Sequence, residues 1–465
     1  MVGLALVVMA LVVVASAASL WGRPSEGIGM PIIAIAVFAY IYVVQPAYMM
    51  SKDMLDAFLT DGMIVKGLVL PALALFCMMW GWRRGDRGAA KNKEGDAPKT
   101  PMWDADRLYR YGMGAAVIGT VLHLIWIQRS GGVTQAYGQI HGQGVETEGF
   151  TAYIWMGSFW ALTGVAMMIL SGAKRRLTPA QHTAIAIFAG AYALSGLLFS
   201  SRTSIFAILA VVWVSHSLAK KSRPSIDRAA PALALACLGV LLMIGYRSVL
   251  YLSSDQVETP TWTEAVTTGL GSDTDVKYGT SGVEFVVHSL ILKTVDETHR
   301  YDTGLSWLEV CTVHMIPRVW WHDKPVQGNW PYWSPLGPKI DKEDILDVTG
   351  IMLATGSSPG IVAEAYENFG LFALVFFLLL GWAFRRFLFH AENNGSPFTM
   401  CAYTMAFALS LNVFAQGFVM LIVPMVYSMA PVFLYYWGDR INQQRMAQAK
   451  ITIRPFRAAQ VRPPA

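Results

Sequence analysis

Long apolar runs separated by short polar segments dominate the chain. A helix needs about 20 apolar residues to cross a bilayer, and roughly eleven runs come close to this length. They cover residues 2–20, 31–50, 63–82, 110–128, 151–171, 182–200, 203–219, 230–250, 359–381, 398–416 and 419–437. The pattern predicts an all-α polytopic integral membrane protein with about eleven transmembrane helices.

One long polar interruption divides these runs into two groups. The first group predicts N-terminal membrane helices over residues 1–250, and the second predicts C-terminal membrane helices over residues 359–438. Residues 251–358 form one large loop between the groups, and residues 439–465 form a basic tail. We expect the first run to be a retained helix, because no basic residue precedes it as in a signal peptide.

Two stretches of the large loop have the periodicity of amphipathic helices. Their apolar positions are Val283, Val286, Val287, Leu290 and Ile291 in the first, and Leu305, Leu308, Thr312 and Met315 in the second. We expect both helices to lie flat on the bilayer, with nearby tryptophans at headgroup level. The large loop is therefore predicted to be a lid on the membrane helices.

Basic residues are concentrated after the third, fifth, seventh and ninth apolar runs and in the tail. All these segments fall on one side of the membrane, which the positive-inside rule makes cytoplasmic. The C-terminus is then cytoplasmic, the N-terminus lies outside, and the large loop is extracytoplasmic. We expect a multi-pass protein of the plasma membrane.

Composition supports a membrane protein and narrows its chemistry. The chain is 54% hydrophobic and 14% charged, whereas a soluble domain carries about a quarter charged residues. The net charge of +5 lies mainly in short loops and the tail, which indicates orientation and no nucleic-acid partner. Four scattered cysteines do not make a disulfide framework.

Four cations predict an anion pocket at the outer face. Arg202 lies in a tight turn among serines and a threonine, Arg247 ends the eighth run, and Arg318 and Lys324 lie in the large loop. Guanidinium groups bind a diphosphate in bidentate fashion, although an arginine at this depth can also simply snorkel to the surface. Because no Walker or Rossmann glycine pattern occurs, a lipid diphosphate is the expected ligand instead of a nucleotide.

Glu364 is the first candidate for a general base. It lies in the first turns of the ninth run, with Asn368 one turn further on the same face. An ionisable group inside a span is costly and suggests function. The alternative is a carboxylate near the N-terminus of a helix that starts after Pro359, where the helix dipole stabilises it.

Histidines of the large loop are further candidates, because imidazole titrates near neutral pH. These residues are His288, His299, His314 and His322. A single histidine is more often ordinary surface. His314 and His322 flank Arg318, but no Glu or Cys completes a zinc-ligand set around them, so we predict no metal site.

The large loop is also rich in aromatic residues. They are Tyr301, Trp307, Trp320, Trp321, Trp330, Tyr332 and Trp333. Such rings stack on the apolar faces of sugars, and they also anchor proteins at lipid headgroups. Both interpretations stay open.

Two segments resemble the Wzy-type polysaccharide repeat-unit polymerases, also called O-antigen polymerases. The first is Ile316-Pro317-Arg318 followed by Trp321-His322-Asp323-Lys324-Pro325, and the second is Ser358-Pro359-Gly360 followed by Glu364-Ala365-Tyr366-Glu367-Asn368-Phe369-Gly370. Together with the arginine in a tight hairpin, the resemblance covers about the second half of the chain.

The resemblance implies a C-type glycosyltransferase on the periplasmic side of a bacterial inner membrane. Such enzymes move a growing glycan from undecaprenyl diphosphate to the non-reducing end of a new lipid-linked oligosaccharide repeat unit, in lipopolysaccharide or exopolysaccharide synthesis. They use no cofactor, and they commonly work with a chain-length regulator protein.

The resemblance also implies roles for individual residues. Arg202, Arg247 and Arg318 would bind the diphosphate and stabilise its developing charge, assisted by Lys324. Glu364, His314 or His322 would take the proton of the acceptor hydroxyl. The residues expected to bind the glycan are Trp320, Trp321, Tyr366 and Asn368.

Two other functions compete with the polymerase. An O-antigen ligase uses the same donor but transfers once, to a lipid A core, and gives a single addition in place of a ladder. A non-catalytic transporter of lipid-linked oligosaccharide would carry charged residues along its spans and need no large lid.

Overall fold

The computed structural model describes residues 1–91, 103–133, 136, 151–199, 201–227, 284–314, 316, 321, 340, 342–351, 353, 359–393 and 395–458. The regular elements in these ranges are helices, and none is a strand. Nine helices of the described part are long and apolar enough to cross a membrane. The predicted all-α polytopic architecture is confirmed at this level.

Nine of the predicted spans lie on those helices. The helices cover Val2–Leu20, Pro31–Ser51, Asp61–Gly85, Ala105–Arg129, Tyr153–Ser171, Pro179–Leu198, Gly360–Asn393, Pro397–Gln416 and Val419–Ile441. The run predicted at 203–219 is also helical, but its apolar part, Thr203–Ala219, is shorter. The run at 230–250 and most of the loop at 251–358 lie outside the described residues, so the total of eleven stays a prediction.

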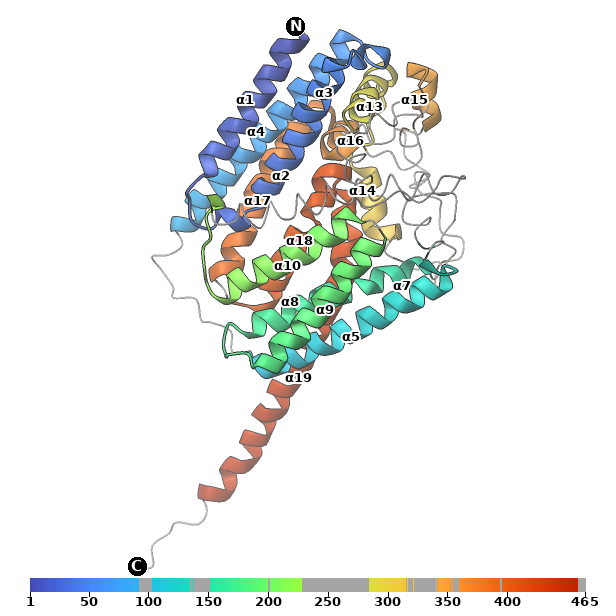
Figure 1. Ribbon diagram of the computed structural model, residues 1–465. Helices are drawn as coiled ribbons and strands as arrows, with labels where there is room; N and C mark the ends of the chain where they lie inside the picture. Colours follow the sequence, from blue (N-terminus) through green and yellow to red (C-terminus); the bar gives the residue numbers. More distant parts are fainter. Residues whose placement is uncertain are drawn as a thin grey trace, which may run out of the picture.

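The spans form two groups of helices joined by a central pair (Figure 1). In the first group, α4 (Asp61–Lys91) packs against α1 (Val2–Leu20) and α17 (Ala373–Asn393), and α2 (Pro31–Ala39) leads through a π-helical turn, Tyr40–Val44, into α3 (Gln45–Ser51). The second group holds α5 (Ala105–Arg129), α7 (Thr151–Ser158), α8 (Trp160–Ser171), α9 (Pro179–Leu198) and α10 (Arg202–Ala219). The central pair, α18 (Pro397–Gln416) and α19 (Val419–Ala458), contacts both groups.

Local sequence explains where several helices begin. Asp104 caps α5 by accepting a hydrogen bond from the backbone N–H of Asp106 at 2.9 Å. At the start of α9, Thr178 and Gln181 form a reciprocal capping box and Pro179 occupies the first turn, a position where proline loses no hydrogen bond. Such caps satisfy the free N–H groups of a first helical turn.

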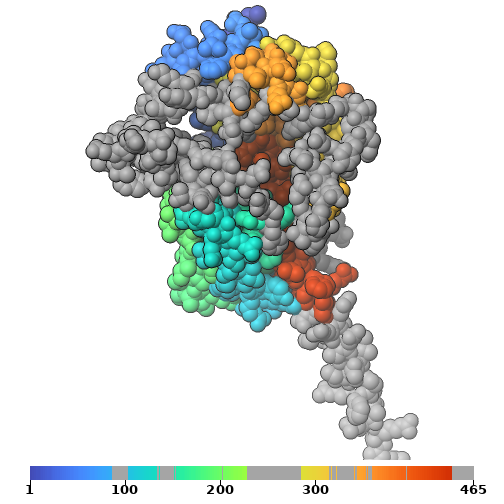
Figure 2. Space-filling model, turned by 90° about the vertical axis from the view of Figure 1, so that its right-hand side faces the viewer, coloured from blue at the N-terminus to red at the C-terminus, as the bar shows by residue number. Residues whose placement is uncertain are grey.

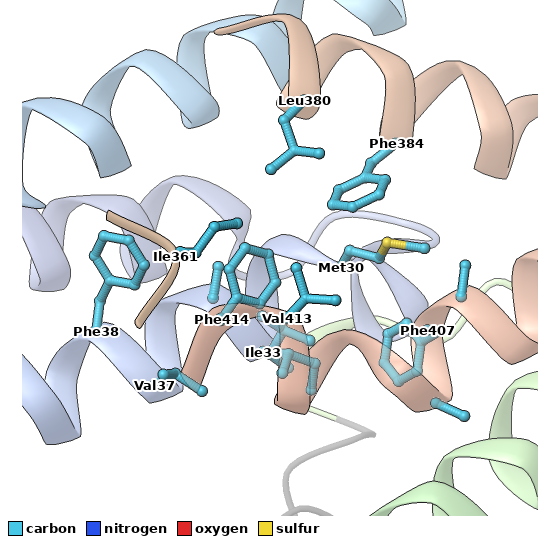
Figure 3. Close-up of a cluster of buried hydrophobic side chains, with 14 of the residues drawn as sticks. Met30, Ile33, Val37, Phe38, Ile361, Leu380, Phe384, Phe407, Val413 and Phe414 are labelled. Carbon is cyan, nitrogen blue, oxygen red and sulfur yellow. The ribbon is translucent and has the colours of Figure 1, made fainter. Parts of the chain in front are cut away.

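An apolar core forms where α2, α17 and α18 meet (Figure 3). Phe38 and Phe414 are fully buried there, with ring centroids 6.5 Å apart in an edge-to-face arrangement. Phe384 of α17 and Phe407 of α18 are also buried in this core. The central pair is therefore fixed to the first group by side-chain packing.

Glycines allow two helix pairs to pack backbone to backbone. A Cβ atom on Gly81 of α4 would overlap with the carbonyl oxygen of Leu378 on α17, and one on Gly381 would overlap with that of Met78. Gly119 of α5 meets the backbone of Ala161 on α8 in the same way. Small residues permit this close approach between membrane helices.

The described basic residues after the third, fifth and ninth apolar runs lie at one end of the bundle, which we call the basic end. There the Arg385 guanidinium lies 5.2 Å from the ring of Trp82, near the C-terminal end of the apolar part of α4. Arg175, after α8, pairs with Asp106 at 2.7 Å. The structure thus joins the chain segments that the positive-inside rule assigns to one side of the membrane.

The first predicted loop helix exists but does not lie flat on a bilayer. It is α13 (Glu284–Thr298), and its residues from Phe285 to Leu292 are all buried. α13 packs against α4, α15 (Lys342–Thr349) and α16 (Gly360–Phe369). The expectation of a flat surface helix is wrong for α13, because periodicity identified one apolar face while neighbouring elements cover the other as well.

The second predicted loop helix is shorter than its predicted apolar face. It consists of α14 (Leu305–Glu309) and a π-helical turn, Val310–His314. Its buried side chains include Ser306 and Val313, whereas Leu308 of the predicted apolar face is 48% exposed. Among the described residues of the predicted face, Leu308 and Thr312 point away from the rest of the protein.

Candidate functional site

The predicted ninth span is a broken helix. α16 ends at Phe369, a short 3-10 turn covers Gly370–Phe372, and α17 begins at Ala373. Gly370 has φ 56° and ψ −135°, a conformation that only glycine adopts readily, and a Cβ atom there would lie 3.0 Å from the ring of Tyr301. Broken membrane helices often form binding sites, because they bring backbone and polar groups into the protein interior.

α16 carries several polar side chains although it is buried on every face. Its residues from Gly360 to Asn368 are all buried, with Glu364 2% exposed, Glu367 3% and Asn368 0%. The backbone carbonyl of Glu367 accepts a hydrogen bond from the Asp302 N–H at 3.0 Å. Buried polar groups require such partners, so α16 is held in place by its polar contacts.

Glu364 links three parts of the fold. One carboxylate oxygen accepts a hydrogen bond from the Trp307 indole at 3.0 Å, and the other accepts one from the backbone N–H of Phe418. Gly417, with φ 137°, is required beside it, because a Cβ atom would overlap with the carboxylate. Glu364 thus joins α16 to α14 and to the turn between α18 and α19.

Asn368 lies one turn beyond Glu364 on the same helix, as predicted. Its amide nitrogen donates to the backbone carbonyl of Glu364 at 2.7 Å, and its amide oxygen accepts from the Ser306 hydroxyl at 3.3 Å. Both ends of the amide are therefore used within the protein. The predicted contact with a glycan stays a prediction.

Tyr366 belongs to a second cluster, together with Lys66 and Asp296, of which only Tyr366 was predicted from the sequence. Its hydroxyl donates to Asp296 Oδ1 at 2.8 Å and accepts from Lys66 Nζ at 2.9 Å. Lys66 also forms an ion pair with Asp296. Lys66 was detectable from the sequence, because an ionisable residue inside a predicted span is unusual, but nothing in the sequence pairs it with Asp296.

His288 lies in a third cluster, beside the π-helical turn of the second span. It is 1% exposed, and its Nδ1 atom lies 3.5 Å from the hydroxyl of Tyr42. Burial, with a smaller contribution from Lys66, lowers the pKa of His288 from 6.5 to about 3. The expectation that His288 titrates near neutral pH is wrong, because the charged form would lose its hydration.

The other predicted site residues are described only in part. Arg202 is the first residue of α10, which Ser201 caps by accepting from the Ser204 N–H at 3.3 Å. His314 ends the π-helical turn after α14, Trp321 is half-buried, and the side chains of Arg202 and His314 lie outside the described residues. Five further candidates lie entirely outside the described residues, namely Arg247, Arg318, Trp320, His322 and Lys324. The predicted diphosphate pocket therefore stays a prediction.

The structure brings three predicted residues together on α16, namely Glu364, Tyr366 and Asn368. No family model, curated protein or solved structure matches the chain. Within the ranges that the structure describes, no group of three His, Cys, Asp or Glu side chains is arranged to hold a metal. The carboxylates around α16 lie in contrasting environments, since Glu364 is 2% exposed whereas the side chain of Asp296 is 40% exposed.

Proposed function

We propose that the chain is a polyprenyl-diphosphate-dependent glycosyltransferase that polymerises lipid-linked oligosaccharide repeat units. The observation that carries the proposal is the broken helix α16 with its buried polar side chains, in one of the two segments that resemble the O-antigen polymerases. The donor would be a glycan on polyprenyl diphosphate, and the acceptor would be a new lipid-linked unit. We place the reaction on the periplasmic side of the inner membrane.

The position of α16 along the bundle supports this side of the membrane. Lys66, near the start of α4, reaches Tyr366 of α16, and Arg83 and Arg84 follow on the same helix about 25 Å further along. α16 therefore lies at the end of the bundle opposite the basic end, and we call this the α16 end. Under the positive-inside rule the α16 end faces the periplasm.

The distribution of charge favours an enzyme over a transporter. α1, α8 and α18 contain no Asp, Glu, Lys or Arg. In α4 such residues lie only near the two ends of the membrane-crossing part. A transporter needs polar groups along its path through the bilayer, whereas an enzyme at one membrane surface needs them at one end.

The start of α10 is a suitable place for the diphosphate. Arg223, which follows α10, pairs with Glu392 of α17 at 4.0 Å, so α10 ends at the basic end. Because α10 is 18 residues long, it begins at the opposite end. Free N–H groups and the helix dipole favour anions at a helix N-terminus, and Arg202 stands at this one. We propose that Arg202, with Arg247, Arg318 and Lys324, binds the leaving diphosphate.

The test is polymer formation by the purified protein in detergent, with polyprenyl diphosphate-linked repeat units and without nucleotide. We expect a ladder of glycans on a gel. If the glycan is transferred only once, and only when a lipid A core is supplied as acceptor, the result would favour the ligase. An unchanged substrate band with folded protein would contradict both enzymes and favour the transporter.

Arg318→Ala tests the diphosphate pocket within the same assay. We expect the ladder to disappear while the amount of protein in the membrane stays at the wild-type level, because the developing phosphate charge loses a bidentate partner. Arg202→Ala should behave alike. Arg300→Ala is the matched control, since Arg300 pairs with Asp344 at 2.8 Å and is not assigned to the pocket; full activity of Arg318→Ala would contradict the pocket.

A further inference from the structure

Three side chains from separate elements meet at the α16 end. Lys66 comes from the second turn of α4, Asp296 from the last turn of α13, and Tyr366 from α16. Tyr366 bonds to one oxygen of the Asp296 carboxylate at 2.8 Å, and Lys66 contacts the other oxygen. The Lys66 ammonium also lies 4.3 Å from the centre of the Tyr366 ring. The carboxylate is thus held at both oxygens in one orientation.

This cluster differs from Glu364 in its access to solvent. The Asp296 side chain is 40% exposed and that of Lys66 is 32% exposed, whereas Glu364 is 2% exposed. A carboxylate offers about four acceptor positions on its two oxygens, and the contacts with Lys66 and Tyr366 use two of them. Figure 2 shows that α13 and α15, in yellow and orange, reach the surface at this end. A hydroxyl arriving from outside can therefore approach Asp296.

Glu364 has the opposite properties. Its two oxygens face the Trp307 indole and the Phe418 backbone, and the Trp307 ring packs against Phe369, Phe376 and Phe418 at centroid distances of 5.1, 4.9 and 5.0 Å. These contacts surround the carboxylate with protein. A general base has to come within about 3 Å of the proton that it removes, and an acceptor sugar would have to displace this packing to reach Glu364.

We propose that Asp296 is the catalytic base of the transfer, with Lys66 and Tyr366 as positioning residues. This inference rests on the proposed glycosyltransferase function. The acceptor hydroxyl gives its proton to the Asp296 carboxylate while its oxygen forms a bond to the anomeric carbon of the donor sugar. The bond between that carbon and the diphosphate oxygen breaks, and polyprenyl diphosphate leaves with the bonding electron pair.

The competing role for the cluster is structural, since the ion pair also ties α13 to α4. Three single variants separate these roles in the polymer assay. Asp296→Asn keeps the size of the side chain and the acceptor for Tyr366, and we expect its initial rate to fall at least about 100-fold. Asp296→Glu should recover part of the rate. Glu297→Gln is the matched control, since Glu297 is the neighbouring, 52% exposed partner of Lys293, and it should stay within about twofold of wild type.

A pH profile adds a measurement that a structural tie would not change. The wild-type rate should fall on the acid side as the base becomes protonated, and the residual activity of Asp296→Asn should lack this fall. A residual rate with an unchanged acid limb would overturn the assignment of Asp296 as the base.

A double variant covers the case in which Asp296→Asn fails to fold because Lys66 loses its partner. Lys66→Met with Asp296→Asn removes both charges, so no cation is left unpaired. We expect a folded protein that still makes no ladder. If the double variant is folded and polymerises at the wild-type rate, Asp296 is not the base although the proposed function stands. If the wild-type protein makes no product, the proposed function fails and the inference fails with it.

Discussion

At the scale of the residue, the Glu364 carboxylate is a structural link whether or not it takes part in chemistry. It accepts one hydrogen bond from Trp307 and one from the backbone of Phe418. Hydrogen bonds to a buried charged group contribute more than neutral ones, and an unsatisfied buried donor costs about 1–3 kcal/mol. The stability of the α16 end therefore depends on both oxygens of this side chain as hydrogen-bond acceptors.

Glu364→Gln should lower the stability of the protein. The amide group cannot accept at both positions, so either the Trp307 indole or the Phe418 N–H loses its acceptor, at a cost of about 1–3 kcal/mol. The measurement is the thermal unfolding midpoint in detergent. Glu297→Gln, at an exposed site, is the control and should leave the midpoint unchanged; an equal midpoint for Glu364→Gln would contradict this assignment.

His288 should make stability depend on pH. Its pKa is about 3 in the folded protein against an ordinary value of 6.5, so the unfolded chain binds more protons below pH 6.5. The free energy of unfolding is therefore highest above pH 6.5 and decreases as the pH falls from 6.5 toward 3. At pH 5 the decrease due to His288 is about 2 kcal/mol.

The check is a comparison of unfolding midpoints at pH 7.5 and pH 5. His288→Gln should lose a large part of the difference between them, because its side chain does not titrate. His299→Gln, at an exposed position, should retain the wild-type difference. The same pH dependence in all three proteins would show that another group is responsible.

At the scale of the element, the break at Gly370 turns one apolar run into two helices with different tasks. α17 packs along α4 as a membrane helix, whereas α16 carries Glu364, Tyr366 and Asn368 into a buried environment. Hydropathy did not predict the break, since residues 359–381 read as one continuous span. The signal was Gly370 itself, since its positive φ favours glycine and a Cβ atom there would crowd the ring of Tyr301.

The pairing of α4 with α17 gives a prediction at this scale. Gly81→Ala places a methyl group against the Leu378 carbonyl, so the backbones must separate, and we expect a loss of about 2–3 kcal/mol. Gly114→Ala in α5 is the matched control, because its Cβ would face open space, and it should stabilise the helix by up to about 1 kcal/mol. Equal unfolding midpoints for the two variants would contradict the close packing.

At the scale of the whole molecule, the orientation in the membrane can be measured with a native cysteine. Cys311 is exposed near α14, which lies on the side of Glu364. With the α16 end in the periplasm, a membrane-impermeant maleimide should label Cys311 in spheroplasts. Partial desolvation by the surrounding protein raises the pKa of the Cys311 thiol, so labelling should be faster at alkaline pH.

The control places a cysteine at the basic end. Lys220→Cys in a Cys311→Ser background should be labelled only after the membrane is opened, because Lys220 directly follows α10. Labelling of Lys220→Cys in intact spheroplasts, with Cys311 protected in the wild type, would reverse the proposed orientation.

The sequence by itself determined the class of protein and the positions of nine of its apolar helices. Runs of apolar residues have to lie in helices inside a bilayer, because lipid offers no partner for backbone polar groups, and nine of the predicted spans lie on helices of the structure. Glu364 and Asn368 were also found from sequence, since a polar pair inside a span is costly.

Only the tertiary structure decided which polar groups meet. Lys66 and Asp296 are separated by 230 residues, and Tyr366 joins them only because α4, α13 and α16 pack against one another. Periodicity reports one face of one element, so it identified α13 as a helix but not the burial of all its residues from Phe285 to Leu292. The contacts that distinguish an accessible carboxylate from a buried one are formed between elements, and the hydropathy of a single chain segment does not contain them.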